Sequence, residues 1–364
     1  MRSTEYPHEA QADLPGVAFA PMRQIILAQA KATNLTVLED ASDRLTVESE
    51  HGLIGLRPGQ STETAGMVAA IDSRWLFVMK NAVVAQMRHL MPEVVEAMRW
   101  SDAGESGGLP PNFSFVRVRS VEHLGPAFLR VTLEGEDLSA HGDQAIHFRL
   151  VLPPKDVAPK WPGVAANGSI KWPEGPDAPH RPVYTSRSVD HGTHTLIMDV
   201  FVHEGGRTTA WAKEVMAGTR GRSVVGIVGP SGGGLLPAKR VLMASDETGF
   251  PAAARLLENL PDGATGDVFL EAEDGSNCNY PLDIPDGINL TWLSRQDGDC
   301  LADATLSALP RYTNQNGAKV WFAGEREEAA RLRTAAQAAG WNKSDLRISG
   351  FWKAQEKDRE PSLR

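Results

Sequence analysis

The sequence contains little cysteine, no long apolar run and no excess of basic residues. Its 364 residues include only Cys278 and Cys300, so neither a disulfide framework nor a cysteine-rich zinc or iron–sulfur centre can be built. No stretch of 18 apolar residues is present, which argues against membrane insertion. Lys and Arg number 37 against 46 Asp and Glu, whereas binding to nucleic acid favours a basic surface. The sequence therefore predicts no nucleic-acid partner.

The first residues also lack the basic head and apolar core of a secretion signal. Together with the scarcity of cysteine, this predicts a cytoplasmic protein. The composition, 41% hydrophobic and 23% charged residues, is typical of a folded globular chain. The length predicts two to three domains.

Hydrophobic periodicity changes several times along the chain and predicts its organisation. Near the start, helix-like and strand-like stretches alternate, with strands expected to include Trp75–Met79 and one closing helix over Ala82–Trp100. Later segments have strand-length apolar runs, and the last segments alternate strand and helix, which is typical of a parallel sheet. The predicted parts are a flexible tail (1–20), a small α+β domain (21–100), a linker (101–111), an antiparallel β-barrel (112–234) and an α/β domain (235–364).

The most informative short motif is the heptapeptide Arg181–Arg187. On a strand, Arg181, Thr185 and Arg187 would share one face. Guanidinium groups suit a diphosphate, and an aromatic ring with a neighbouring hydroxyl suits a flavin ring. A solvated edge strand with two surface arginines explains the same residues.

A second motif combines the end of a strand at His203, two glycines, and a helix opened by Thr208 and Thr209. The N-terminus of a helix offers unpaired N–H groups and partial positive charge, which favour a diphosphate. A threonine there is also an ordinary helix cap. The glycine run 229–234 lacks the Lys and Ser or Thr of a phosphate loop. The glycine run is compatible either with a backbone segment that approaches a ligand closely or with an interdomain hinge.

A third motif, Asp246-Glu247-Thr248, follows a buried strand and precedes a helix with Pro251 in its first turn. The carboxyl end of a strand in an α/β sheet is where a nucleotide docks. Capping of the helix by Asp246 or Thr248 is the simpler alternative.

These motifs, in this order, resemble those of the siderophore-interacting protein family of FAD-dependent ferric-siderophore reductases. The family pattern Arg-x-Tyr-Thr-x-Arg is matched by Arg181, Tyr184, Thr185 and Arg187. Further matches are His203 with the Gly206–Ala212 segment, Gly229-Pro230-x-Gly232, the Asp-Glu-Thr motif, Trp321 to Glu325, and Gly350-Phe351-Trp352. The resemblance covers residues 112–353. It implies a ferredoxin-reductase-like fold in which a β-barrel binds FAD and a parallel α/β domain binds NADPH or NADH. Residues 20–100 resemble a small domain of unknown function that some of these reductases carry.

The resemblance also implies individual roles. Tyr184, against the isoalloxazine, and Thr185, near its N5, would be the catalytic residues, and no residue would bind a metal. Ser294 and Arg295 would clamp a 2′-phosphate. The implied FAD-binding and nucleotide-binding residues are Arg181, Tyr184, Thr185, Ser186, Arg187, Val202, His203, Gly206, Thr208, Thr209, Trp211, Gly229, Asp246, Glu247, Thr248, Ser294 and Arg295.

The implied reaction passes electrons from NAD(P)H through flavin to Fe(III) in a siderophore, which then releases Fe(II). Residues 146–222 carry ten Lys or Arg against seven Asp or Glu, so the expected flavin region is locally basic in an acidic chain. Two alternatives remain open. One is a flavin-dependent reductase for another acceptor, such as free flavin, a quinone or a ferredoxin partner. The other is a flavin-binding adaptor without enzymatic activity.

Overall fold

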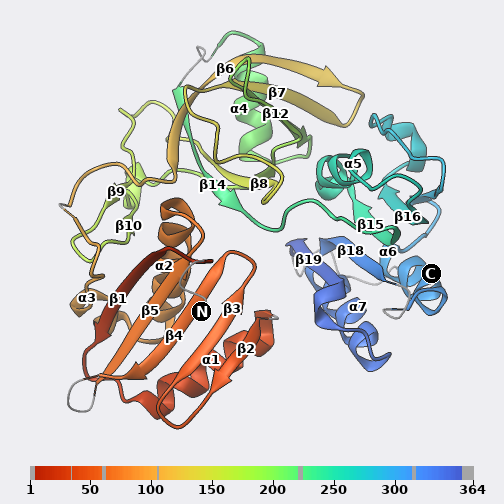
Figure 1. Cartoon of the computed structure of the whole chain (residues 1–364). Coiled ribbons are helices and arrows are strands. Elements are labelled where there is room, and N and C mark those ends of the chain that lie inside the picture. Colours follow the sequence, from red (N-terminus) through yellow and green to blue (C-terminus); the bar gives the residue numbers. More distant parts are fainter. Residues whose placement is uncertain are drawn as a thin grey trace, which may run out of the picture. The chain divides into compact units, whose positions relative to one another are not determined.

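The computed structural model of the chain describes residues 5–33, 35–59, 63–104, 106–219, 224–313 and 317–354. The chain divides into two compact units (Figure 1). One comprises Met1–Phe113 and Val151–His180, and the other comprises Ser114–Leu150 and Arg181–Arg364. The first unit therefore includes an insertion that interrupts the second unit in sequence. Within the described residues, no helix is both long and apolar enough to cross a bilayer.

The first unit is built on a five-stranded antiparallel sheet in the order β1-β5-β4-β3-β2. Helices α1 and α2 contribute Met22 and Met87 to one apolar cluster with Ile54 and Val68 of the sheet, which gives the α+β class predicted for this part. The elements are β1 (His8–Leu14), α1 (Phe19–Thr33), β2 (Thr36–Asp40), β3 (Leu45–Ser49), β4 (Gly52–Pro58), β5 (Thr64–Ala70), α2 (Ser73–Leu90) and α3 (Pro92–Ala97).

Three sequence predictions for this unit are wrong. The flexible tail over 1–20 contains β1, which pairs with β5 along its whole length and buries Ala10, Ala12 and Leu14 on one face. Residues Trp75–Met79 lie in α2, because the carboxylate of Asp72 caps the helix by accepting the N–H of Trp75 at 2.7 Å. The single closing helix is broken at Met91, since Pro92 disfavours a helical residue before it.

Segment 101–111 packs within the first unit. The N–H of Ser101 donates to the carbonyl of Gln11 in β1, and the N–H of Gln11 donates to the Ser101 hydroxyl. Further along, Gly107 donates to Val164, and Val164 donates to Gly108, each at 2.9 Å. These bonds join the segment to the insertion, which also contains β9 (Gly163–Val164), β10 (Ile170–Lys171) and η1 (Gly175–Asp177).

Two asparagines fix the far end of the insertion. The side chain of Asn81, in α2, accepts the N–H of Ile170 at 2.7 Å. The side chain of Asn167 donates to the carbonyl of Val95 at 3.0 Å, and its backbone carbonyl accepts from Trp100. The long loop predicted over 153–180 is thus held by hydrogen bonds to the amino-terminal sheet-and-helix layer.

The second unit begins with a seven-stranded sheet in the order β11-β8-β14-β6-β7-β13-β12. The two strands at its edges, β11 and β12, are separated in sequence only by Ser186 and Arg187, so the edges meet and the sheet closes into the predicted barrel. The N–H of Arg187 donates to Ile197 of β13 across this closure. The elements are β6 (Phe113–Leu124), β7 (Phe128–Glu134), β8 (His147–Val151), β11 (Val183–Thr185), β12 (Ser188–Asp190), β13 (Thr195–Phe201), α4 (Arg207–Met216) and β14 (Val224–Ser231).

The remainder is a parallel sheet in the order β17-β16-β15-β18-β19. Successive residues of its central strands enter different cores: Val241 and Met243 pack with α5, whereas Leu242 and Ala244 pack with α6 and α7. Burial on both faces explains the continuous apolar runs. The elements are β15 (Arg240–Asp246), η2 (Glu247–Gly249), α5 (Phe250–Glu258), β16 (Thr265–Ala272), η3 (Gly275–Cys278), β17 (Ile288–Ser294), α6 (Leu301–Ala308), η4 (Leu309–Arg311), β18 (Ala318–Glu325), α7 (Arg326–Ala338), η6 (Lys343–Asp345) and β19 (Leu346–Trp352).

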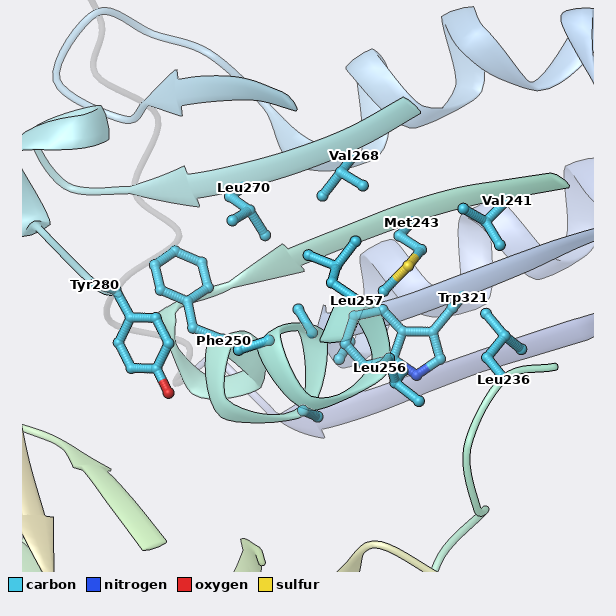
Figure 2. Packing of buried hydrophobic residues seen from close by; sticks show 14 of the residues in the cluster. Leu236, Val241, Met243, Phe250, Leu256, Leu257, Val268, Leu270, Tyr280 and Trp321 are labelled. Carbon is cyan, nitrogen blue, oxygen red and sulfur yellow. The ribbon is translucent and has the colours of Figure 1, made fainter. Parts of the chain in front are cut away.

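The core on the α5 side also includes residues of the barrel. Figure 2 shows Phe250 and Tyr280 at one end of this cluster and Trp321 and Leu236 at the other. Phe128 of the barrel packs against both Phe250 and Tyr280, with its ring centroid 6.0 and 4.7 Å from theirs. The barrel and the parallel-sheet domain therefore share one continuous apolar core.

The ion pair between the buried Lys80 and the half-buried Asp102 generates a stability prediction. The ammonium of Lys80 lies 2.6 Å from both carboxylate oxygens, and its side chain is only 4% exposed. Asp102→Ala leaves a buried charge without its partner and should lower the opening free energy of α2 by about 3 kcal/mol. Hydrogen exchange of the α2 amides measures this value.

Two controls separate charge from packing. The double change Lys80→Met with Asp102→Ala should restore most of the loss, because an apolar side chain tolerates burial. Lys160→Ala removes an exposed pair with Asp177 in the same unit and should cost less than about 1 kcal/mol. An Asp102→Ala loss as small as that of Lys160→Ala would contradict the argument.

Candidate functional site

Helix α4 presents an N-terminus without a side-chain cap. Its N-cap residue is Gly206, so Thr208 and Thr209 lie inside the first turn, and the capping alternative for them is wrong. Both are buried, and Thr209 donates to the carbonyl of Phe201 at 3.4 Å. A Cβ on Gly206 would lie 2.8 Å from the ring of His203, so the turn before the helix is tight. The first N–H groups of α4 are thereby left to an external acceptor.

Tyr184 of β11 faces this helix. Tyr184 and Thr185 are adjacent on a strand, so their side chains leave opposite faces of β11. Tyr184 pairs in register with Phe148 of β8. Burial raises the pKa of its phenol, and a hydrogen bond with Thr208 partly offsets that increase. The aromatic ring of the heptapeptide and the start of α4 thus lie together.

Two arginines, Arg149 and Arg181, lie next to one another, and Arg149 is on the face of the β8–β11 pair that is opposite Tyr184. Arg149 of β8 is the register partner of Val183, and its guanidinium donates to the backbone carbonyl of Arg181 at 3.2 Å. Burial and the charge of Arg149 both lower the pKa of Arg181. Two close positive charges favour an anion, and sequence reasoning did not identify Arg149. The alternation of charged and apolar residues in His147–Val151 is the sequence pattern from which Arg149 could have been identified.

The other two polar residues of the heptapeptide are joined to the parallel-sheet domain. The predicted alternation of Arg181, Thr185 and Arg187 along one strand is wrong at both ends, because β11 spans only Val183–Thr185. Both terminal nitrogens of Arg187 bind Glu258 of α5. The hydroxyl of Ser186 is buried, donates to Ile146 and accepts from Arg255 at 2.8 Å. The contacts of Ser186 and Arg187 therefore hold the heptapeptide against α5.

The glycine run packs against protein rather than forming an open loop. Gly229 and Pro230 belong to β14, and a Cβ on Gly229 would lie 2.8 Å from His141. Gly232 has a positive φ of 72°, and a Cβ there would lie 2.4 Å from the ring of His147. The glycines therefore let this segment pass close to residues that precede and begin β8.

His147 is a further residue that sequence reasoning missed. It is the register partner of Thr185, and its Nδ1 lies 3.3 Å from the Thr185 hydroxyl. The ring of Phe351, in β19, meets it edge-on with centroids 5.7 Å apart. Burial, together with the charge of Arg255, lowers the pKa of His147 to about 4. His147 is therefore neutral at physiological pH.

The donors at this location fit a flavin dinucleotide. The uncapped start of α4, the hydroxyls of Thr208 and Thr209 and the Arg149–Arg181 pair are complementary to phosphate. In the part of the chain that the structure describes, the buried side-chain nitrogens without a hydrogen-bond partner include Nε1 of Trp211, in α4, and Nε of Arg187, in the heptapeptide. Unsatisfied buried donors are costly, and an acceptor-rich ligand would satisfy them.

The carboxyl edge of the parallel sheet holds the Asp-Glu-Thr motif. Asp246 caps η2 by accepting the backbone N–H of Thr248 at 2.9 Å and its hydroxyl at 2.5 Å. Its second oxygen accepts from the indole of Trp352 at 2.6 Å. Burial raises the pKa of Asp246 to about 6. Asp246 therefore caps η2 and not α5, whose N-cap is Gly249 without a side-chain cap, so the predicted capping of the Pro251 helix by Asp246 or Thr248 is wrong. The Asp246 carboxylate also holds the end of β19.

Arg295 is surrounded by carboxylates. Its guanidinium binds Glu247, Glu271 at 3.1 Å and Glu273 at 3.4 Å. The neighbouring Ser294 donates its hydroxyl to the carbonyl of Glu273. The side chain expected to clamp a 2′-phosphate is thus paired with acids at the carboxyl ends of two adjacent strands, β15 and β16. A phosphate has to compete with these acids for Arg295.

A further acidic residue lies at this edge. The thiol of Cys300 lies 3.6 Å from a carboxylate oxygen of Glu328. Burial, with the nearby charge of Glu271, raises the pKa of Glu328 to about 7.

Two further predicted site residues, Val202 and His203, follow β13. Val202 donates its N–H to the carbonyl of Ala127, and His203 is exposed and forms a hydrogen bond with the carbonyl of Glu204 through Nδ1.

Comparisons with known proteins agree with the two-part architecture of the second unit. A family model described as the siderophore-interacting FAD-binding domain matches residues 117–234. A second, described as siderophore-interacting protein, matches residues 238–355. The chain is 28% identical over 253 residues to the NADPH-dependent ferric-chelate reductase of Escherichia coli, covering 67% of this chain and 94% of that protein. It is also 28% identical to the ferric vibriobactin reductase ViuB of Vibrio cholerae, covering 62% and 82%.

Solved structures give the same result. A siderophore utilization protein from T. fusca superposes with a TM-score of 0.55 at 27% identity, covering 68% of this chain and 95% of that one. The siderophore-interacting protein SipS from Aeromonas hydrophila has the same fold, with a TM-score of 0.54 at 21% identity over 67% and 99% of the two chains. Through residues 117–234 and 238–355, the chain belongs to the siderophore-interacting protein family.

Proposed function

We propose that the chain is an FAD-dependent ferric-siderophore reductase that takes electrons from NADPH. The observation that carries the proposal is that Tyr184 lies against the uncapped start of α4, through its hydrogen bond with Thr208, within the domain that matches the FAD-binding family. Two relatives, most of whose length this chain matches, are named ferric-chelate and ferric vibriobactin reductases. When bound, FAD would accept a hydride from the nicotinamide and return single electrons to Fe(III).

The residues of the barrel would bind and orient FAD. The first turn of α4, with Thr208 and Thr209, would receive the diphosphate, and Arg181 with Arg149 would supply positive charge. Tyr184 would pack against the isoalloxazine, and the Thr185 hydroxyl would lie near N5. Arg187 and Ser186 contribute by holding β11 against α5, and the Nε of Arg187 remains as a donor. The implied contacts of Val202, His203, Gly206, Trp211 and Gly229 stay proposals.

The carboxyl edge of the parallel sheet would receive the nucleotide, since ligands of such sheets dock there. Asp246 and Glu247 are buried, so their role would be to hold the loop in place, leaving Thr248 closer to the ligand. No metal ligand is needed, because the iron arrives in its own chelator. Fe(II) binds hard oxygen chelators more weakly than Fe(III), so reduction releases it. The cytoplasm is the compartment in which we place this reaction, because it supplies NADPH and keeps thiols reduced.

Anaerobic stopped-flow spectroscopy tests the proposed function. The FAD-loaded chain should lose its flavin absorbance on mixing with NADPH, and a ferric siderophore should restore that absorbance with two Fe(III) reduced per NADPH oxidised. A ferrous-specific chelator in the second mix counts the iron released.

The alternatives give different outcomes. Loss of absorbance without recovery on ferric siderophores, but with recovery on a quinone or free flavin, would indicate another acceptor. No reduction by NADPH or NADH, but reduction by a reduced ferredoxin, would place a ferredoxin as electron donor. A chain that binds FAD and is reduced by none of these would be an adaptor.

Arg295 gives a second prediction. If Arg295 leaves its acidic partners to bind a 2′-phosphate, Arg295→Ala should raise the KM for NADPH about tenfold, the loss expected for a charge-assisted hydrogen bond. The KM for NADH should change less than twofold. Steady-state kinetics with both nucleotides measure the difference.

Arg311→Ala is the matched control, because Arg311 forms an exposed pair with Asp267 and should affect neither KM. Equal changes in both KM values for Arg295→Ala would show that Arg295 acts only by supporting its three carboxylates.

A further inference from the structure

We propose that His147 is a positioning residue that orients the Thr185 hydroxyl toward the flavin, with Nδ1 of the imidazole accepting the hydroxyl proton. The inference deepens the proposed function and rests on it. Its direct basis is the cross-strand register of β8 and β11, which sets Thr185 opposite His147 with 3.3 Å between Oγ1 and Nδ1.

The surroundings hold the imidazole in place on several sides. Gly232 passes so close that any side chain there would collide with the ring carbons. Phe351 packs against the ring edge-on from β19. Thr185 itself is 6% exposed, so water has little access to its hydroxyl. A ring held in this way keeps Nδ1 directed at one partner.

The charge state of the ring matters for this role. A protonated imidazole is a donor at both nitrogens, whereas a neutral one has one donor and one acceptor. Burial and the nearby Arg255 keep His147 neutral. With the remaining proton on Nε2, Nδ1 is an acceptor, and the Thr185 hydroxyl becomes its donor.

The consequence concerns the two oxidation states of the cofactor. Reduced flavin carries a hydrogen on N5 and needs an acceptor, whereas oxidised N5 is itself an acceptor. When Nδ1 of His147 accepts the hydrogen bond of the Thr185 hydroxyl, the lone pairs of Oγ1 remain available to accept from the N5–H of reduced flavin. Without His147 the hydroxyl is free to donate to oxidised N5. His147 therefore favours the reduced form.

Spectroelectrochemical titration of the FAD-loaded chain tests this role. Two substitutions are matched, because the amide of Asn places its polar atoms at the position of Nδ1, whereas that of Gln reaches the position of Nε2. His147→Gln should change the ratio of oxidised to reduced FAD at a fixed potential about tenfold toward the oxidised form, which is about 30 mV for a two-electron couple. His147→Asn should stay within about twofold of the wild type.

A double-mutant cycle separates positioning from a general structural effect. In a Thr185→Val background, His147→Gln should add no further change to the ratio, because the hydroxyl is gone. His123→Gln, at an exposed position in β6, is the control and should leave the ratio unchanged.

Each outcome decides the inference. A wild-type chain that binds no FAD overturns the proposed function and the role of His147 together. If the wild-type chain binds FAD, but His147→Gln changes the ratio of oxidised to reduced FAD equally with and without the Thr185 hydroxyl, the role of His147 alone is overturned. The same holds if His147→Asn and His147→Gln behave alike.

Discussion

The buried carboxylate of Asp199 is the interaction on which the second unit depends. Its side chain is fully excluded from solvent, and it accepts two hydrogen bonds of 2.8 Å from Arg130 in the neighbouring strand. Tyr280, from the parallel-sheet domain, donates a third at 2.6 Å. A buried charge is tolerated only when it is paired and hydrogen-bonded. The barrel and the parallel-sheet domain must therefore meet at this point, where Asp199 lies two residues before the end of β13.

The same junction positions the heptapeptide. Arg187 reaches Glu258, and Arg255 reaches Ser186 and Asp143, so α5 is joined to the strand that carries Tyr184. The side chains expected to meet the flavin are held between two domains rather than on a free strand. This is why two polar residues of the motif, Ser186 and Arg187, have structural partners. In the proposed function, the motif would contribute to flavin binding through its geometry as well as through its charges.

Sequence patterns predicted the elements with strong periodicity. The apolar runs of β15 and β18 and the amphipathic pattern of α7 are local features, and all three elements are present. The order of the barrel and the parallel sheet was also predictable, because the first has a succession of strand-length apolar runs and the second alternates strand and helix patterns. The tail was misread because Ala10 and Ala12 are small, and only their pairing with β5 shows that they are buried. Trp75–Met79 was misread because the cap from Asp72 outweighs an apolar run that is also compatible with a strand.

The site was predictable in residue type but not in pairing. The Tyr-Thr pair and the start of α4 are local, and the sequence identified them. The partners of Arg187 and Arg295 are 71 and 22 to 48 residues away, and several Glu residues could have filled those roles. His147 was missed because its role depends on the register of two strands joined by the 153–180 insertion. No local pattern reports such a register.

The most direct test of the account is a crystal structure of the chain with FAD. The diphosphate should lie at the first turn of α4 and the isoalloxazine against Tyr184, with the Thr185 hydroxyl bonded to both N5 and His147. Asp199 should keep Arg130 and Tyr280 as partners. FAD bound away from α4, or a flavin ring that meets neither Tyr184 nor Thr185, would contradict it.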